Sequence, residues 1–271
     1  MVTRSDLAAT LAQRSRLTPT CYSVRFAFDA AIPTAVPGQF VMLRPEQGDR
    51  PFWGRAYSIA GTGASDTQPT MELMIKTVGP GTALWEQLPL GTRARIVGPL
   101  GVGFPCLPAP RSVALVAGGI GLPPLLFAAH RLAGTDARCD LYLGAATAAE
   151  LIEPQRCRAA AEATGGQLFP VTDDGTAGEA GLVTEALQHR LAEGRRYTAI
   201  WACGPMPMLR AATQVGERWD VPVHVALEER MACGVGVCLG CIIPTSDGAH
   251  IRTCSEGPVV DGSLIDWETA C

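Results

Sequence analysis

Apolar and polar residues alternate over short stretches in the N-terminal part of the chain. Residues 21–28 follow the two-residue period of a strand with one buried face, and residues 39–43 and 71–78 are further strand candidates. Glycine and proline residues separate these stretches, and one short helix is expected at residues 82–88. This spacing of strands and turns predicts an antiparallel barrel or sandwich.

The pattern changes at residue 111, where short apolar runs begin to alternate with segments of helical period. The predicted strands are residues 113–117, 139–144, 167–172 and 198–203. The predicted helices are residues 123–133, 149–164, 179–192 and 206–219. Such alternation predicts a doubly wound parallel α/β sheet, so the fold class is an antiparallel β-barrel, an α/β domain and a small C-terminal module.

The composition narrows the class of protein. Of the 271 residues, 47% are hydrophobic and 18% are charged, which excludes a disordered chain. A net charge of −4 and a pI near 5.6 argue against nucleic-acid binding. The uncharged stretch 112–129 has the length of a short transmembrane helix, but its glycines and central prolines would break one, so no membrane is expected as a partner.

Four of the ten cysteines lie close together, and the other six are scattered. Cys233, Cys238 and Cys241 have the C-x4-C-x2-C spacing of plant-type [2Fe–2S] ligands, and Cys254 follows as a fourth thiolate. Glycines between them let the backbone wrap a cluster and aim N–H groups at it. A structural zinc site is the alternative, although zinc sites mostly use C-x2-C pairs. The chain start lacks an export signal, which predicts reduced thiols and a cytoplasmic protein.

Residues 55–58 read Arg-Ala-Tyr-Ser, which resembles the R-x-Y-S strand motif of the ferredoxin–NADP reductase superfamily. The resemblance implies that Arg55 meets the pyrophosphate of FAD, because a guanidinium binds phosphate oxygens in pairs. It also implies that Tyr57 packs on the flavin ring and that Ser58 reaches the reactive nitrogen N5, with Ala56 between the first two. The four residues are therefore the first part of a predicted FAD site.

A glycine turn supplies the second part of the predicted FAD site. Gly81 and Thr82 stand where the short helix begins, and a helix N-terminus binds phosphate groups. In the superfamily this Gly-Thr pair closes on FAD, and the preceding strand lines the cofactor; here that strand contains Met74, Ile75 and Lys76. Residues 98–101, Gly-Pro-Leu-Gly, match the turn that ends the superfamily's barrel.

The glycine-rich turn after the first α/β strand resembles the superfamily's G-G-x-G-x-x-P turn, through Gly118, Gly119 and Gly121. It predicts a site for the phosphates of NAD at the start of the following helix. Residues Cys203, Gly204 and Pro205 match the C-G-P turn whose cysteine lies near the nicotinamide. Cys203 and Ser58 are thus the predicted catalytic residues, and a purely structural role for Cys203 is an equal alternative.

The segment 172–184 has the pattern T-D-D-G-x-x-G-x-x-G-x-V-T. We associate this pattern with the electron-transfer subunit of dihydroorotate dehydrogenase, so Asp173 and Asp174 join the predicted nucleotide site. Residues 144–148 lack the arginine that usually binds a 2′-phosphate, which favours NAD over NADP.

Taken in order, these motifs resemble the electron-transfer subunit of dihydroorotate dehydrogenase B over nearly the whole chain. The resemblance implies that residues 1–105 bind FAD, residues 106–221 bind NAD(H) and residues 222–271 hold the [2Fe–2S] cluster. It implies an FMN-containing catalytic partner, in a heterotetramer of two plus two chains, and electron flow from dihydroorotate through FMN, cluster and FAD to NAD⁺. Ala56 departs from many members of the family, which have proline at that position.

Two alternatives remain at the level of sequence. A chain of the same design would serve a ferredoxin–NAD(P) reductase, a sulfide- or sulfite-type reductase or an oxygenase reductase, and the short cluster module weakens the last of these. A non-enzymatic zinc-binding interaction protein is an alternative of a different class. An absorption spectrum with flavin and iron–sulfur bands would exclude it.

Overall fold

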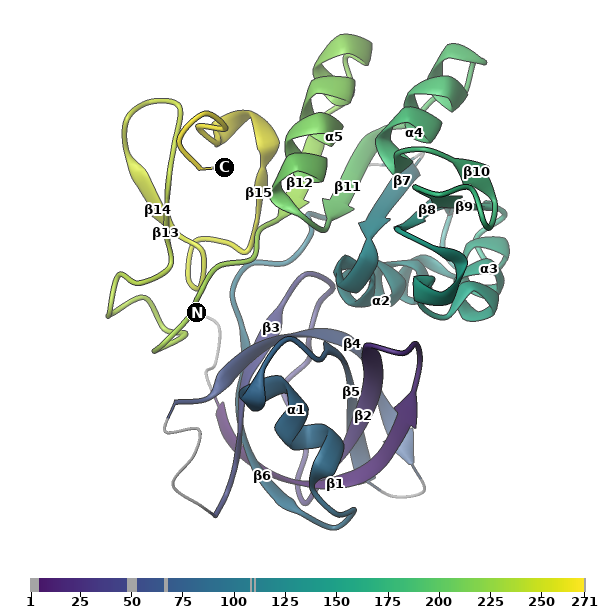
Figure 1. The fold of residues 1–271 in the computed structure, drawn as a ribbon. Helices are drawn as coiled ribbons and strands as arrows, with labels where there is room; N and C mark the ends of the chain where they lie inside the picture. Colours follow the sequence, from purple (N-terminus) through teal and green to yellow (C-terminus); the bar gives the residue numbers. More distant parts are fainter. Residues whose placement is uncertain (1–4, 48–52, 66–67, 108, 110, 271) are drawn as a thin grey trace.

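The computed structural model describes residues 5–47, 53–65, 68–107, 109 and 111–270. In Figure 1 a closed β-barrel lies at the bottom, an α/β layer lies above it, and the C-terminal segment lies beside that layer. In the part of the chain described, no helix combines the length and the apolar character that crossing a membrane requires.

Six antiparallel strands close the barrel in the order β1-β2-β5-β4-β3-β6. Their bounds are β1 (Ser5–Arg16), β2 (Cys21–Phe28), β3 (Phe40–Pro45), β4 (Arg55–Ser65), β5 (Gln68–Lys76) and β6 (Arg93–Leu100). Tyr22, Val24 and Phe26 alternate into the barrel from β2. The helix α1 (Pro80–Gln87) packs against these strands, with the rings of Trp85 and Phe26 edge to face at 5.3 Å. The first domain is therefore a barrel and not a sandwich.

Strand β1 is the part of the barrel that the hydrophobic pattern did not predict. Ala9 and Leu11 are its buried residues, and both are followed by partly or fully exposed positions. A bulge between Leu11 and Gln13 shifts the set of inward-facing residues by one position. The shift and the small size of the buried side chains hide the two-residue period.

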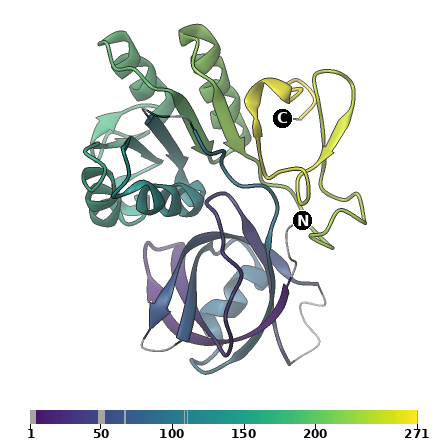
Figure 2. The same cartoon turned by 180° about the vertical axis from the view of Figure 1, so that it is seen from behind.

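Seven strands form the α/β sheet, in the order β10-β9-β8-β7-β11-β12-β15. Their bounds are β7 (Arg111–Gly118), β8 (Ala137–Ala145), β9 (Leu168–Thr172), β10 (Glu179–Ala180), β11 (Ala199–Cys203), β12 (Val223–Ala226) and β15 (Val259–Asp261). Helices α2 (Leu122–Leu132) and α3 (Pro154–Glu162) cover one face, and α4 (Val183–Ala192) and α5 (Met206–Trp219) cover the other (Figure 2). All neighbouring strands are parallel except β12 and β15. The doubly wound prediction is confirmed, with one antiparallel edge.

Three predicted segments differ from the structure in the type or extent of their elements. The helix expected at 149–164 is a 3₁₀ turn, η2 (Ala148–Glu150), followed by α3, because Pro154 lacks an N–H and is accepted only in a first helical turn. The segment 179–192 divides into β10 and α4 around Gly181, whose φ of +112° is unsuited to a helix. Gly98 to Leu100, expected in a turn, ends strand β6.

The C-terminal segment is tied to the edge of the α/β sheet. It contributes β12 and β15 to that sheet, and between them it forms a hairpin of β13 (Ile242–Pro244) and β14 (His250–Arg252). The remaining 3₁₀ turns are η1 (Gly119–Gly121) and η3 (Gly262–Leu264). The sheet therefore fixes the segment before and after the cysteine cluster.

Barrel and α/β layer meet along β4, β5 and α2. Phe127 of α2 belongs to the barrel core, where it packs among the barrel's buried side chains. Arg156 of α3 donates two hydrogen bonds, at 2.7 and 2.8 Å, to the buried carboxylate of Glu72 on β5. A buried carboxylate held by a bidentate guanidinium fixes the angle between the two parts.

Candidate functional site

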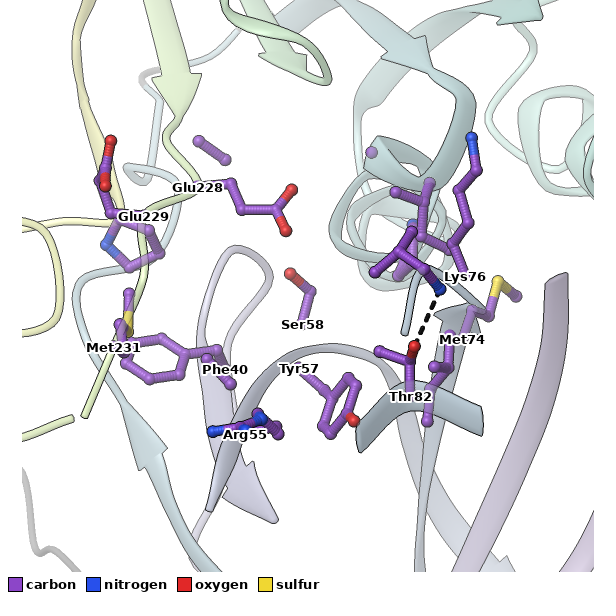
Figure 3. A pocket seen from close by; sticks show the side chains of 18 of the residues that line it. Phe40, Arg55, Tyr57, Ser58, Met74, Lys76, Thr82, Glu228, Glu229 and Met231 are labelled. Atoms are coloured by element: carbon purple, nitrogen blue, oxygen red, sulfur yellow. Dashed lines mark hydrogen bonds between the residues drawn. The ribbon is translucent and has the colours of Figure 1, made fainter. Parts of the chain in front are cut away.

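A cavity of about 940 Å³ lies where the barrel, the α/β layer and the segment after β12 meet (Figure 3). We call it the flavin cavity. The predicted FAD residues all line it: Arg55, Ala56, Tyr57, Ser58, Met74, Ile75, Lys76, Gly81 and Thr82. The fold thus brings together two strands and one helix start that are separate in sequence.

Strand β4 places the R-x-Y-S residues along one wall of the flavin cavity. Tyr57 is buried, and its hydroxyl donates to the carbonyl oxygen of Gly81 at 3.5 Å. Burial raises the pKa of Tyr57 to about 12, so the ring stays neutral at physiological pH. Arg55 is exposed at the start of the strand and Ser58 is half-buried. This order puts a cation, a flat ring and a small hydroxyl in sequence along the cavity.

The start of α1 lies beside Arg55. A Cβ atom added to Gly81 would come within 3.1 Å of Arg55 Nε, so glycine permits this close approach. The hydroxyl of Thr82 accepts hydrogen bonds from the N–H groups of Val78 at 2.9 Å and Gly79 at 3.1 Å, which fixes the turn. A guanidinium and a helix start side by side suit a pyrophosphate group.

A second cavity of about 500 Å³ opens at the carboxyl ends of β7, β8 and β11, and we call it the nucleotide cavity. Gly118, Gly119 and Gly121 line it. A Cβ on Gly121 would lie 2.0 Å from the carbonyl oxygen of Cys203, so only glycine lets the two strand ends touch. Gly119 has a φ of +52° and open space around its Cβ position, which leaves bare backbone for a ligand.

The C-G-P turn divides between the two cavities. Cys203 lines the flavin cavity, whereas Gly204 and Pro205 line the nucleotide cavity. Burial, with a contribution from the carboxylate of Glu228, raises the pKa of Cys203 to about 12. The thiol is therefore neutral, so Cys203 presents an uncharged sulfur where the two cavities meet.

The two aspartates of the Asp-Asp-Gly loop lie differently. Asp173 lines the nucleotide cavity. Asp174 lines neither cavity; its carboxylate accepts hydrogen bonds from the N–H of Thr176 at 3.0 Å and from its hydroxyl at 2.6 Å. These bonds hold the turn and lower the pKa of Asp174. In this geometry the side-chain hydrogen bonds of Asp174 stay within the loop.

Four residues line both cavities, and the sequence identified only two of them as site residues. Lys76 and Gly121 were predicted, whereas Ile120 and Glu228 were not. Glu228 lies two residues after the end of β12, the last strand before the cysteines, and its carboxylate points into the flavin cavity (Figure 3). A charged residue just beyond the end of a strand, at the ligand edge of an α/β sheet, is a signal that could have identified it.

The cysteine loop, residues 233–241, wraps three of the four predicted ligands. Gly234 and Gly236 have φ values of +68° and +83°, which only glycine adopts readily. The N–H of Gly236 donates to Cys254 Sγ at 3.1 Å, and the N–H of Val235 donates to Cys233 Sγ at 3.4 Å. Burial opposes ionisation of Cys233, but backbone N–H groups outweigh it and lower its pKa to about 6.

The hairpin β13–β14 brings in the fourth ligand. It begins directly after Cys241 and ends two residues before Cys254. Thr253 closes it, because its N–H and its hydroxyl donate to the carbonyl of Cys241 at 3.0 and 2.8 Å. Cys241 and Cys254 are both buried beneath it. This hairpin explains how a ligand thirteen positions further on returns to the loop.

The cysteine thiols lie close enough to affect one another's ionisation, Cys233 with Cys238, and Cys254 with both Cys241 and Cys233. A zinc ion needs all four thiols around one point, whereas a two-iron cluster takes two on each iron. Ser255 adds a buried hydroxyl without a hydrogen-bond partner in the described chain, next to Gly236. Thiols on a glycine-rich loop, with backbone N–H donors and a spare hydroxyl beside them, fit a [2Fe–2S] cluster.

A barrel with a flavin cavity, a nucleotide cavity at its border and an iron–sulfur loop defines a ferredoxin-reductase-type oxidoreductase. Two family models agree with this class. The model described as the iron-sulfur cluster binding domain of dihydroorotate dehydrogenase B matches residues 228–266, and the oxidoreductase NAD-binding domain matches residues 115–214.

Curated relatives specify the family. The dihydroorotate dehydrogenase B (NAD(+)) electron transfer subunit of Desulforamulus reducens is 36% identical over 255 residues, which cover 92% of this chain and 94% of the relative. The subunit of the same name from Geobacillus thermodenitrificans is 38% identical over 228 residues, covering 82% and 84%. The chain belongs to the family of dihydroorotate dehydrogenase B electron transfer subunits.

Solved structures agree with this assignment. An NADH-dependent reduced ferredoxin-NADP oxidoreductase, studied for flavin-based electron bifurcation, matches with a TM-score of 0.83 and 26% identity, over 97% of this chain and 91% of the other. A cytochrome P450 reductase from Amycolatopsis matches with a TM-score of 0.69 and 27% identity, over 83% and 70%. The predicted fold, the electron-transfer function and the three cofactors, FAD, [2Fe–2S] and NAD(H), are confirmed at this level.

Proposed function

We propose that this chain connects NAD(H) to the FMN-containing catalytic subunit of a dihydroorotate dehydrogenase. In this proposal residues 1–105 hold FAD, residues 106–221 hold NAD(H), and residues 222–271 hold the [2Fe–2S] cluster. Bound FAD supplies the step between the two-electron chemistry of nicotinamide and the one-electron chemistry of the cluster. The chain itself contributes binding, alignment and insulation from water.

One observation supports the proposal above the others: the three candidate sites adjoin one another. Lys76, Gly121 and Glu228 line both cavities, so ligands of the two cavities would meet there. Phe40 lines the flavin cavity and packs in one buried group with Met42, Leu100, Cys241 and Cys254. This buried group connects the wall of the flavin cavity with two of the cysteine ligands.

In the flavin cavity each residue has one role in this proposal. Arg55 and the start of α1 bind the pyrophosphate of FAD, because both direct positive charge to the same place. Tyr57 packs its neutral ring on the flavin, and Ser58 offers a hydroxyl to N5. Cys203 faces the nicotinamide as a neutral thiol. Hydride transfer needs alignment more than acid or base, which suits these uncharged side chains.

The nucleotide cavity favours NAD over NADP. Its lining contains the carboxylates of Glu150 and Asp173 and includes no arginine. A carboxylate accepts hydrogen bonds from ribose hydroxyls and repels a 2′-phosphate. Gly119 supplies open backbone for the diphosphate between the two nucleosides. We therefore assign the unphosphorylated dinucleotide to this cavity.

The partner would dock over the exposed side of the cysteine loop. Cys238 is exposed, and its neighbours Val237 and Leu239 are 77% and 57% exposed. Apolar side chains at this exposure favour burial in a protein interface. A catalytic subunit seated here would bring its FMN near the cluster, in a heterotetramer of two plus two chains. The nine described cysteines are free thiols, which suits assembly in the cytoplasm.

Co-expression with a candidate catalytic subunit tests the proposed function. We expect the two chains to purify together, with flavin and iron–sulfur absorption, and the complex to reduce NAD⁺ when dihydroorotate is added. Reduced ferredoxin serves as the competing electron donor, because the chain also resembles a ferredoxin-NADP oxidoreductase. A chain that purifies alone and reduces NAD⁺ with ferredoxin but not with dihydroorotate would refute the assigned partner.

A further inference from the structure

Glu72 and Arg156 form an ion pair across the border between the barrel and the α/β layer. The two terminal nitrogens of Arg156 donate to the two carboxylate oxygens of Glu72 at 2.7 and 2.8 Å. Of the ion pairs between described residues, this one alone connects a barrel strand with a helix of the α/β layer. Burial opposes ionisation of Glu72, but the guanidinium of Arg156 outweighs it and lowers the pKa of Glu72. The pair is therefore charged at physiological pH.

On the barrel side, Glu72 shares a strand face with residues of the flavin cavity. Side chains alternate along β5, so Met71 and Leu73 pack in the barrel core, whereas Glu72, Met74 and Lys76 face the other way. Met74 packs in the core of the α/β layer. Met74 and Lys76 both line the flavin cavity. A shift of Glu72 would therefore move one wall of that cavity.

On the α/β side, Arg156 comes soon after a segment of the nucleotide cavity. Glu150 and Ile152 line that cavity, and α3 begins at Pro154, two residues before Arg156. The next residue, Cys157, is buried in the core of the α/β layer, which holds the helix start in place. The ion pair thus connects one wall of each cavity.

Apolar packing alone would let the two parts slide against one another. Phe127 of α2 packs in the barrel core, but apolar contacts have no preferred direction, and parts of a chain that meet over such surfaces commonly move. A guanidinium and a carboxylate joined by two hydrogen bonds keep one plane and one distance. Hydride transfer needs such precision, because the reacting atoms must lie about 3–3.5 Å apart and an error of about 1 Å slows the reaction about 100-fold.

We propose that Glu72 and Arg156 are positioning residues for hydride transfer between NAD(H) and FAD, and this inference rests on the proposed function. In that step a hydride leaves C4 of NADH for N5 of FAD, which yields NAD⁺ and the anionic reduced flavin; the reverse step reduces NAD⁺. Neither residue lines a cavity, so neither touches a ligand. The pair acts by holding the cavity wall at Met74 in register with the segment at Ile152.

Anaerobic stopped-flow reduction by NADH of the full chain, loaded with FAD and cluster, tests this role. Glu72→Gln and Arg156→Gln should each lower the limiting rate of flavin reduction about tenfold or more. The double variant should be no slower than the slower single variant, because both changes break the same link. FAD content should stay at the wild-type ratio. The Kd of ADP-ribose, which lacks the nicotinamide, should also stay at the wild-type value.

Arg25→Gln is the matched control. Arg25 lies 3.6 Å from the same carboxylate, but it stands on β2 directly opposite Glu72, so it connects two strands of the barrel. Its removal should leave the limiting rate at the wild-type value. Arg156→Lys should fall between the wild type and Arg156→Gln, because an ammonium keeps the charge without the paired geometry.

Two results would overturn the inference. Limiting rates equal to the wild type in Glu72→Gln and Arg156→Gln would show that the pair does not align the ligands. Loss of FAD, or a rise in the ADP-ribose Kd as large as the fall in rate, would show that the pair maintains the cavities themselves. If the glutamine variants do not fold, Arg156→Lys is judged by the same criteria. If NADH does not reduce the wild-type protein, the proposed function fails, and the inference fails with it.

Discussion

The flavin cavity and the cysteine loop solve the same problem, holding a redox group, with different parts of the chain. Side chains build the flavin cavity: Arg55, Tyr57 and Ser58 each offer a different group to the ligand. Backbone builds much of the cysteine loop, where N–H groups of Val235 and Gly236 point at thiol sulfurs. Removing one side chain should therefore weaken FAD binding only in part, whereas removing one cysteine ligand should prevent the cluster from binding.

Replacing Cys238, an exposed cluster ligand, should show most clearly that the cysteine loop and the flavin cavity hold their redox groups independently. In Cys238→Ser, a hard hydroxyl stands in place of a thiolate, so we expect iron and sulfide content to fall by more than half. FAD should remain at the wild-type ratio, because Cys238 lies outside the flavin cavity. Iron analysis and flavin absorbance on the same sample measure both.

The matched control for this variant is Cys106→Ser. Cys106 is also exposed, but it lies outside the cysteine loop. The Cys106→Ser protein should keep the full iron content of the wild type. Unchanged iron in Cys238→Ser would contradict the ligand assignment, and loss of FAD in that variant would contradict the independence of the two regions.

Arg55→Ala is the converse experiment, with a smaller expected effect. It removes the guanidinium beside α1, and the loss of two charge-assisted hydrogen bonds should raise the Kd for FAD about 100-fold. Fluorescence titration of the FAD-free protein measures this change. The Kd of Arg55→Lys for FAD should lie between those of the wild type and Arg55→Ala, because an ammonium keeps the charge without the paired geometry. Iron content should stay constant, and an equal loss of iron would show that the regions fold as one unit.

The same contrast explains what the sequence could predict. The predicted ligands Cys233, Cys238 and Cys241 lie within nine residues of one another, so their spacing alone indicates the cluster. Cys254 was predicted only as the next cysteine along the chain, and the hairpin that returns it to Cys241 is seen in the structure alone. Likewise, the R-x-Y-S residues lie on one strand, and the motif identifies them without knowledge of the fold.

Residues that act across the border between regions were harder to predict. Glu228 lines both cavities only because β12 ends between them, and Lys76 extends towards the second cavity only because α2 and α3 fix the barrel's angle. Strand β1 was missed because a bulge breaks its period. These features depend on tertiary contacts, which hydrophobic periodicity does not report.

The smallest effect concerns Ser255, a side chain that lies beside the cysteine loop. Its hydroxyl is buried without a partner in the described chain, beside Gly236, so a cluster sulfur is the acceptor we expect. A donor to sulfur favours the reduced, more negative cluster. A hydrogen bond of about 1 kcal/mol corresponds to about 40 mV for one electron, so Ser255→Ala should lower the cluster's midpoint potential by that amount.

A redox titration followed by electron paramagnetic resonance measures this shift, with iron content as a check that the cluster is intact. Ser263→Ala is the control, because that serine lies in the same C-terminal segment and its hydroxyl already donates to Asp261 at 2.8 Å. It should leave the potential unchanged. If Ser255→Ala has the midpoint potential of the wild type, the Ser255 hydroxyl does not contribute and the donors to sulfur are backbone N–H groups. The cluster site would then differ fully from the flavin cavity, where side chains supply the groups that contact the ligand.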